Sequence, residues 1–374
     1  MSLEIRAVAS HREIREFIEL PFRLHSTSPQ WVPPLRLERR FFLSRKHNAF
    51  FTHGDARLFL AWRDGRVVGR ISAQYNLAYD GQHPDEATGM FGFLEVEDDP
   101  EALRGLLEAA AGWLRARGRT RMLGPMDFTM NDESGVLIEG FEREPMIRQP
   151  WHPPYYQRLL EDAGLAKAMD LYMWELSIAD RGSVRPILFR LAEEAETKHG
   201  VTLRKMTRRS LRRDLDAFGE IYNAAWAENW DFVPFSKADL DAYAQELQLV
   251  FDSDWFMVAE KDGEPIAVNI TIPDVNQVLK RMNGRLLPLG WWHYLRRRRI
   301  MDRVRVGFLG VKPEFQHTGV AAQMYIEQFN LAADTQYTWG EQGWILETNK
   351  SMNRSMEAMG GRVVKRYRMY ERAL

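Results

Sequence analysis

Apolar and polar positions along this chain predict the same order of elements twice. In each half an apolar run, an Asp-Gly pair and a second apolar run predict a β-hairpin, within 57–76 and within 255–272. Apolar residues at helical spacing precede each hairpin, and alternating strand and helix patterns follow it. Hairpins followed by crossover connections are typical of a mixed α/β sheet. The pattern therefore predicts two tandem units, 1–178 and 179–374.

The charge balance bears on the class of partner. Fifty-one basic and 52 acidic residues leave a formal net charge of -1, so no global field attracts nucleic acid or an anionic membrane. We therefore expect no nucleic-acid partner and no stable membrane association. The segment 290–300, GWWHYLRRRRI, joins aromatic residues to four arginines. We interpret it as a helix over the mouth of a pocket, with nucleic-acid or membrane contact as the alternative.

The sequence gives no support for disulfides, a metal site, a signal peptide or a membrane span. The chain has no cysteine, which suits a reducing compartment, and it shows neither a signal peptide nor an apolar run long enough for a membrane span. Its nine histidines show no metal-ligand spacing, so no metal is expected. These features favour a cytoplasmic protein of unspecified oligomeric state.

One stretch, VKPEFQHTGVAA at 311–322, carries the candidate chemistry. A strand pattern ends at Pro313, which has no N–H to donate, and a helical pattern begins after Gly319. The first turn of a helix leaves N–H groups without partners, and together with the helix dipole they attract anions. A side chain at Gly319 would keep a phosphate away from those groups, which is a reason for glycine there.

The same stretch resembles the coenzyme A pyrophosphate loop of the GNAT (acyl-CoA N-acyltransferase) superfamily, in which Gln/Arg-x-x-Gly-x-Gly/Ala follows a strand. The resemblance covers the second half well and the first half only in the order of its elements. It implies a tandem GNAT-like fold and a cofactor that is acetyl-CoA or another acyl-CoA. The residues that it assigns to the cofactor are Leu309, Val311, Gln316, His317, Thr318, Gly319, Val320, Ala321 and Asn349.

The catalytic residues follow less directly from the resemblance. The family often has a general-acid tyrosine seven residues after the asparagine, where this chain has Met356, which cannot donate a proton. Water, Tyr367 or Tyr370 on the last predicted strand would then protonate the leaving thiolate, unless no transfer occurs. Glu347, at the end of a strand beside the cofactor, is the candidate general base, and the alternative is a solvent-facing or ion-paired glutamate.

The first half lacks the glycine loop. At the equivalent helix start it has Glu97, Asp98, Asp99 and Glu101, which satisfy the helix dipole and would repel a phosphate. We therefore predict a degenerate unit without a coenzyme site. Its long polar and aromatic loop is either a structural loop or a source of substrate contacts. The candidate contacts are Asn131, Asp132, Glu133, Tyr155 and Tyr156.

These expectations combine into one leading function and two alternatives. The leading hypothesis is direct acyl transfer, most simply of an acetyl group, from coenzyme A to a small-molecule amine or a peptide presented between the units. A longer acyl or an aminoacyl group is the first alternative, because the Fem-type and N-myristoyl transferases share a doubled fold. A module that binds coenzyme A or a metabolite without catalysis is the second, favoured by Met356.

Overall fold

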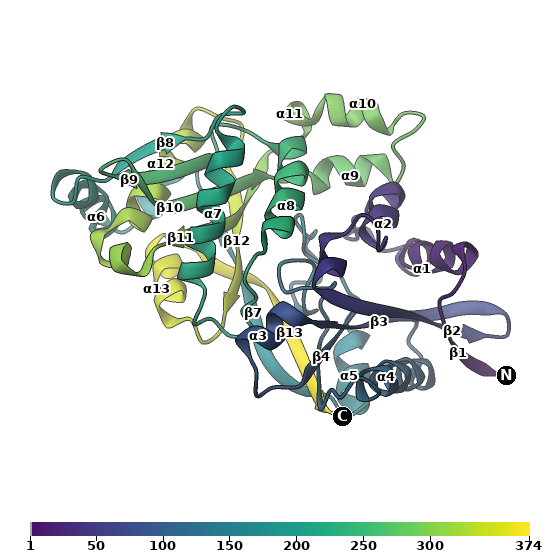
Figure 1. The fold of residues 1–374 in the computed structure, drawn as a ribbon. Helices are drawn as coiled ribbons and strands as arrows, with labels where there is room; N and C mark the ends of the chain where they lie inside the picture. The colour runs from purple at the N-terminus through teal and green to yellow at the C-terminus, as the bar shows by residue number, and fades with distance from the viewer. Residues whose placement is uncertain (1) are drawn as a thin grey trace. The chain divides into compact units, whose positions relative to one another are not determined.

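The computed structural model describes residues 2–374 and divides them into two compact units (Figure 1). The first comprises the described residues up to Leu171, together with Leu279–His293 and Lys365–Leu374, and the second comprises Tyr172–Val278 and Tyr294–Val364. The segments Leu279–His293 and Lys365–Leu374, which the sequence pattern placed in the second half, therefore group with the first unit. Both units are mixed α/β, as the sequence predicted.

The first unit is a sheet with helices on both faces. Its strands run in the order β1-β2-β3-β4-β5-β13. Helices α1 and α2 lie on one face, and α4 and α5 lie on the other (Figure 1). The elements are β1 Leu3–Ala7, α1 His11–Leu24, α2 Arg36–Phe42, η1 Ala49–Thr52, β2 Gly54–Arg63, β3 Arg66–Asn76, α3 Leu77–Gln82, β4 Thr88–Val96, α4 Pro100–Arg115, β5 Arg121–Gly124, β6 Val136–Glu139, α5 Tyr155–Asp162 and β7 Ala166–Leu176, the last of which continues into the second unit.

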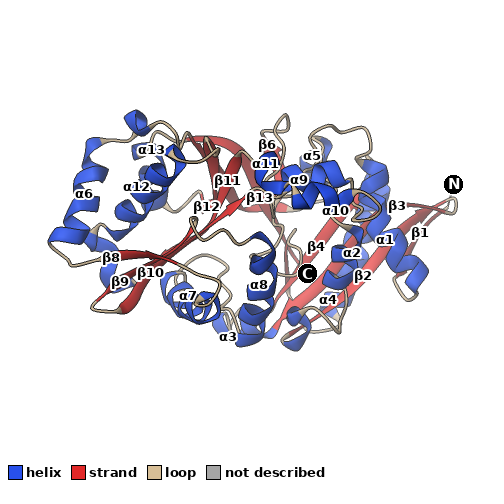
Figure 2. Ribbon diagram, turned by 90° about the horizontal axis from the view of Figure 1, so that it is seen from above, coloured by secondary structure: helices blue, strands red, loops and turns tan. Residues whose placement is uncertain are grey.

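The second unit repeats this plan. Its strands run in the order β12-β11-β10-β9-β8, with α7 and α8 on one face and α6, α12 and α13 on the other (Figure 2). The elements are η2 Arg181–Ser183, α6 Pro186–Thr197, β8 Thr202–Lys205, α7 Leu211–Ala225, α8 Lys237–Val250, β9 Phe256–Lys261, β10 Glu264–Pro273, α9 Asn276–Met282, α10 Gly290–Leu295, α11 Arg297–Ile300, β11 Arg303–Val311, η3 Pro313–Thr318, α12 Val320–Ala333, β12 Trp339–Leu346, α13 Lys350–Ala358 and β13 Arg362–Ala373. Of these, α9, α10 and β13 each have residues in both units.

The two Asp-Gly hairpins form as predicted. Asp64 and Gly65 join β2 to β3 with φ of 49° and 80°, and Asp262 and Gly263 join β9 to β10 with φ of 52° and 83°. Aspartate tolerates this left-handed conformation better than most residues, and glycine adopts it without steric cost. The turn chemistry therefore determines both hairpins.

The last strand explains why the C-terminus groups with the first unit. β13 pairs with β5 from Tyr370↔Gly124 to Ala373↔Arg121, and it also pairs with β6. Its side chains enter the first unit's interior, where Tyr367 and Tyr370 are fully buried. A fragment that begins near residue 179 would therefore remove a strand from the first unit.

No helix within residues 2–374 is both long enough and apolar enough to span a bilayer.

Candidate functional site

In the second unit, one edge of β11 is open over its last residues. β11 pairs with β12 only from Arg303↔Trp339 to Val306↔Gln342, whereas it pairs with β10 as far as Val311. The N–H of Lys312 donates to the carbonyl of Ile266 (3.0 Å), which fixes the alternation of the antiparallel ladder. The backbone N–H and C=O groups of Leu309 and Val311 therefore point away from β10, toward the edge that β12 leaves.

The chain then turns through η3 and Gly319 into α12. Gln316 and His317 are exposed, whereas Thr318 is buried and donates its hydroxyl to the carbonyl of Phe315 (2.7 Å). Val320 is buried and Ala321 is partly buried. No side chain caps the N-terminus of α12, so its first N–H groups receive no side-chain partner.

The structure gives a reason for glycine at position 319 that does not depend on phosphate binding. Its φ is +81°, and a Cβ there would lie 2.4 Å from the carbonyl oxygen of Leu191 in α6. Glycine is therefore required by the left-handed backbone and by the approach of α6, whether or not a phosphate binds nearby. A bulky residue at this position would test the packing of α6 before it tested coenzyme binding.

We expect Gly319→Ala to lower the free energy of unfolding by about 2–4 kcal/mol, because it adds backbone strain to a steric overlap. Gly263→Ala is the matched control, since Gly263 has a φ of +83° and no atom within 4 Å of an added Cβ. Chemical denaturation of both variants separates the cost of the positive φ, which both share, from the cost of the overlap with Leu191, which only Gly319→Ala has. Equal losses in the two variants would contradict the role assigned to Leu191.

Glu347 and Asn349 lie just after β12. Glu347 is half-buried in the turn that follows the strand. Asn349 is the N-cap of α13, and its side-chain oxygen accepts from the N–H of Met352 (3.0 Å). Met356, on the same helix, is fully buried. The capping hydrogen bond is by itself a reason for asparagine at position 349. Contact between Asn349 and a cofactor stays a prediction.

The structure does not favour Tyr367 or Tyr370 as the general acid. Both are fully buried in the part of β13 that belongs to the first unit. The hydroxyl of Tyr367 donates to the carbonyl of Pro150 (3.1 Å), and that of Tyr370 donates to Glu161 Oε1 (3.2 Å). Burial and the charge of Glu161 raise the pKa of Tyr370. A tyrosine in this setting holds its proton, so we do not carry the acid role forward.

The equivalent edge of the first unit is filled by the chain itself. β4 pairs with β5 only as far as Met90↔Leu123, and beyond that point the N–H of Met126 donates to the carbonyl of Phe91 (2.8 Å). A Cβ at Gly92 would lie 1.8 Å from the carbonyl oxygen of Met126. No open length of strand comparable to that of β11 remains here.

The start of α4 is also occupied, as the acidic sequence predicted. Asp99 is the N-cap, and its Oδ1 accepts from the N–H groups of Glu101 (3.1 Å) and Ala102 (3.0 Å). Arg63 Nε donates to the other oxygen of Asp99 (2.9 Å). An anion at this helix start would compete with a carboxylate that is already bound.

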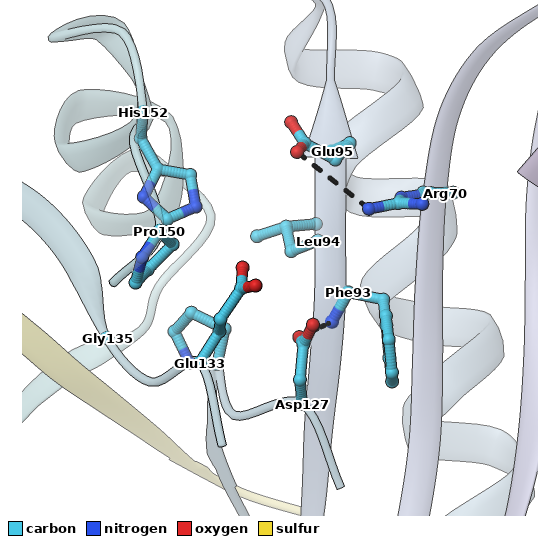
Figure 3. A pocket seen from close by; sticks show the side chains of 10 residues that line it. Arg70, Phe93, Leu94, Glu95, Asp127, Glu133, Gly135, Pro150 and His152 are labelled. Carbon is cyan, nitrogen blue, oxygen red and sulfur yellow. Dashed lines mark hydrogen bonds and ion pairs between the residues drawn. The ribbon is translucent and has the colours of Figure 1, made fainter. Parts of the chain in front are cut away.

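The first unit has instead a small cavity lined by ionisable side chains (Figure 3). Its volume is ≈ 30 Å³, which is room for about one or two water molecules. The carboxylate of Glu133 points into the space beside His152 (Figure 3). The lining residues are Arg70, Phe93, Leu94, Glu95, Pro125, Asp127, Glu133, Gly135, Pro150 and His152.

Glu95 is the centre of a buried charge network at this cavity. Its Oε2 accepts from His25 Nε2 (2.8 Å) and from the hydroxyl of Tyr156 (2.8 Å), and Arg70 lies 3.9 Å from its other oxygen. Burial by itself raises the pKa of Glu95, but the charge and hydrogen bond of His25 and the charge of Arg70 outweigh it and lower the pKa to about 2. Glu95 is therefore an anion at neutral pH.

The remaining titratable groups of the cavity differ in charge state. Burial lowers the pKa of His152 to about 4, and its Nδ1 accepts from the N–H of Leu137 (3.3 Å), so the ring is neutral with a proton on Nε2. Burial and the nearby Glu133 raise the pKa of Asp127 well above its usual value. Arg39 lies 3.8 Å from Asp127 and 3.6 Å from Glu133. A cavity of this size with polar lining groups suits an ordered water.

Of the five predicted substrate contacts, the structure brings two to this cavity. Glu133 lines it, and Tyr156 hydrogen-bonds to Glu95. Asn131 accepts from Arg148 through its carbonyl (2.9 Å), Asp132 accepts from Thr129 (2.8 Å), and Tyr155 donates to the carbonyl of Val96 (2.8 Å). These three contacts fix the loop and its neighbours.

Sequence reasoning missed five other ionisable residues of this cluster. The available signal was a charge inside an otherwise apolar strand pattern, Arg70 in β3 and Glu95 in β4. No three or more His, Cys, Asp or Glu side chains in the described chain are grouped so as to hold a metal ion. The missed residues are His25, Arg70, Glu95, Asp127 and His152.

Comparison with known proteins gives close relatives over the full length. No protein-family model matches the chain. It is 35% identical over 378 residues to the bacterial ceramide synthase of Caulobacter vibrioides, with 100% of this chain and 98% of that protein aligned. It is 32% identical over 376 residues to the protein YghO of Escherichia coli, with 99% of this chain and 95% of that protein aligned.

Solved structures show the fold. A tandem GNAT protein from the clavulanic acid biosynthesis pathway aligns over 100% of this chain and 98% of its own length, with a TM-score of 0.57 and 12% identity. A GCN5-related N-acetyltransferase from Sphaerobacter thermophilus aligns over 99% and 95%, with a TM-score of 0.52 and 13% identity. The chain thus has the predicted tandem GNAT fold, and it belongs to the family that contains the bacterial ceramide synthase of Caulobacter vibrioides and YghO of Escherichia coli.

Proposed function

We propose that this protein is an acyl-CoA-dependent N-acyltransferase whose second unit binds the acyl donor. The observation that carries the proposal is the open edge of β11 at Leu309 and Val311, which leads into the loop from Gln316 to Ala321. The amide groups of an extended acyl-CoA arm can pair with such an edge as a short strand does. The first unit offers no such place, because the chain fills its edge and Asp99 caps its helix.

The name of one relative supports a proposal for the class of acceptor. A ceramide is the amide of a fatty acid and a long-chain amino alcohol, and a relative with that synthase activity in its name aligns with the whole chain at 35% identity. We therefore propose a fatty acyl-CoA as the donor and the amine of a long-chain amino alcohol as the acceptor. This choice favours the long-chain alternative over simple acetyl transfer.

The chemistry requires one proton acceptor and one leaving group. The amine must lose a proton so that its nitrogen can attack the thioester carbonyl, after which the new C–N bond remains and the C–S bond breaks. We assign the proton to Glu347, directly or through one water, because the residue is half-buried at the end of β12. Water protonates the coenzyme A thiolate, since Met356 cannot donate a proton.

The decisive experiment follows thiol release from a fatty acyl-CoA with and without a long-chain amino alcohol, together with the mass of the amide formed. We expect thiol release that depends on the acceptor, with one amide formed per thiol. A module that binds coenzyme A or a metabolite without catalysis, the alternative suggested by Met356, would bind the donor and release no thiol above the rate without acceptor.

Gln316→Glu tests the coenzyme loop. The two side chains have nearly the same shape and Gln316 is exposed, so the substitution adds one negative charge and removes only the long hydrogen bond from Gln316 Nε2 to the carbonyl of Val311 (3.4 Å). A charge near a bound pyrophosphate costs on the order of 2 kcal/mol, so we expect at least about tenfold weaker binding of coenzyme A by calorimetry. Gln248→Glu, on an exposed position of α8, is the control for net charge. Equal affinities in both variants would remove the loop from the donor site.

A further inference from the structure

One segment of the chain carries a concentrated positive charge. Between Asp274 and Asp302 the sequence has no acidic residue, yet it contains seven basic ones. The whole chain has a formal net charge of -1, so this local excess of positive charge is balanced by acidic residues elsewhere in the chain. The seven are Lys280, Arg281, Arg285, Arg296, Arg297, Arg298 and Arg299.

The same segment exposes large apolar side chains. The loop between α9 and α10, together with the first turn of α10, exposes five of them within seven residues. Single exposed apolar residues are common, but a contiguous group of this size marks a contact surface. We call this group the leucine-tryptophan patch, and its members are Leu286 (40% exposed), Leu287 (72%), Leu289 (71%), Trp291 (43%) and Trp292 (47%).

The patch is held in a defined conformation. The N–H of Trp291 donates to the carbonyl of Leu286 (2.8 Å), and its indole N–H donates to the carbonyl of Pro288 (2.7 Å). A Cβ at Gly290 would lie 2.0 Å from the carbonyl oxygen of Arg285, so the turn is closely packed. These contacts present Leu287 and Leu289 to solvent rather than to the interior.

The segment just before the patch, which belongs to the first unit, makes several contacts within that unit. Lys280 donates to the carbonyl of Pro29 (2.6 Å) and forms an ion pair with Glu144. The N–H of Arg36 donates to the carbonyl of Gly284 (3.2 Å). The exposed leucines therefore project from an anchored segment.

Basic side chains next to the patch have no carboxylate partners. Arg281 and Arg285, in the same unit as the patch, are exposed, and neither forms an ion pair with any residue of 2–374. The segment thus combines an apolar projection with unpaired positive charge.

We propose that the leucine-tryptophan patch and its arginines bind the surface of an anionic lipid bilayer. Leucine side chains at such an interface enter the acyl boundary, tryptophans lie at headgroup depth, and arginines attract anionic headgroups. A nucleic acid would use the arginines and leave the leucines in water. The proposal stands on this surface alone, independently of catalysis, and revises the expectation of no stable membrane association, which rested on net charge.

The test is co-sedimentation of the full-length protein with phosphatidylcholine vesicles that contain or lack phosphatidylglycerol. We expect binding to the anionic vesicles and at least about tenfold weaker partitioning of Leu287→Ser/Leu289→Ser, since burial of each apolar group contributes to interfacial binding. The matched control is Leu37→Ser/Leu77→Ser, which changes two leucines of the first unit that are 53% and 58% exposed outside the patch. Unchanged partitioning of the patch variant would overturn the proposal.

A second pair of variants tests the charge. Arg281→Gln/Arg285→Gln is expected to lower binding to anionic vesicles about tenfold and to leave the weak binding to neutral vesicles unchanged. Arg212→Gln, another exposed arginine, serves as the control. Retention of a nucleic-acid duplex by the parent with no vesicle binding would overturn the proposal, as would a patch variant that alters only the oligomeric state in size-exclusion chromatography.

Discussion

Replacing Glu347 with glutamine is expected to lower the turnover of acyl transfer by about 10²–10⁴-fold, with the affinity for coenzyme A unchanged. Glutamine has nearly the shape of glutamate but cannot accept the proton that the attacking ammonium must lose. The loss should shrink as the pH rises, because a larger fraction of the amine is then already neutral. Steady-state rates between about pH 7 and 9.5, together with calorimetry of coenzyme A binding, measure both quantities.

Glu133→Gln is the companion variant, because Glu133 is the carboxylate that points into the first unit's cavity (Figure 3). We expect it to change turnover far less than Glu347→Gln does. The opposite result, a large loss for Glu133→Gln beside a parent-like rate for Glu347→Gln, would move the base to the cavity and reject the assignment to β12.

Local patterns predicted the parts of the fold that local chemistry determines. The Asp-Gly turns fix both hairpins, and the apolar spacing predicted the strand and helix on either side of Gly319. The final strand shows where this reasoning ends. Its sequence reads as the last strand of the second half, yet its partners β5 and β6 lie more than two hundred residues earlier. Strand pairing at that separation has no local signature.

Of the two candidate sites, the sequence predicted the one formed by a contiguous stretch and missed the one assembled by the tertiary fold. The loop from Gln316 to Ala321 is contiguous, so a single stretch of sequence was enough to identify it. The cavity of the first unit combines residues from α1's C-cap, two strands and a long loop, with His25 and His152 far apart along the chain. Its existence depends on the tertiary fold. Even at the loop, the reason for Gly319 emerged only with the neighbouring backbone of α6.

Two groups at the cavity of the first unit also contribute to the response of the protein to acid. The folded-state pKa of Glu95, about 2, lies below its ordinary value of 4.5, so its contribution to stability is complete above about pH 4.5 and is lost as the pH falls toward 2. The folded-state pKa of His152, about 4, lies below 6.5, so the unfolded chain binds this proton first. His152 first and Glu95 afterwards therefore lower stability from about pH 6.5 downward, whereas the raised pKa of Asp127 acts in the opposite direction.

Glu95→Gln is expected to lower the free energy of unfolding at pH 7 by about 3–5 kcal/mol, because it leaves the charge of Arg70 buried without the carboxylate that balances it and removes the charged acceptor of the His25 hydrogen bond. The variant should also lose the acid dependence between about pH 4.5 and 2, while His152→Gln should lose the dependence between 6.5 and 4. Urea denaturation at a series of pH values measures each window, with the exposed Glu139→Gln as the control. A Glu95→Gln loss below about 1 kcal/mol, no larger than that of the control, would show that the buried network does not stabilise the first unit.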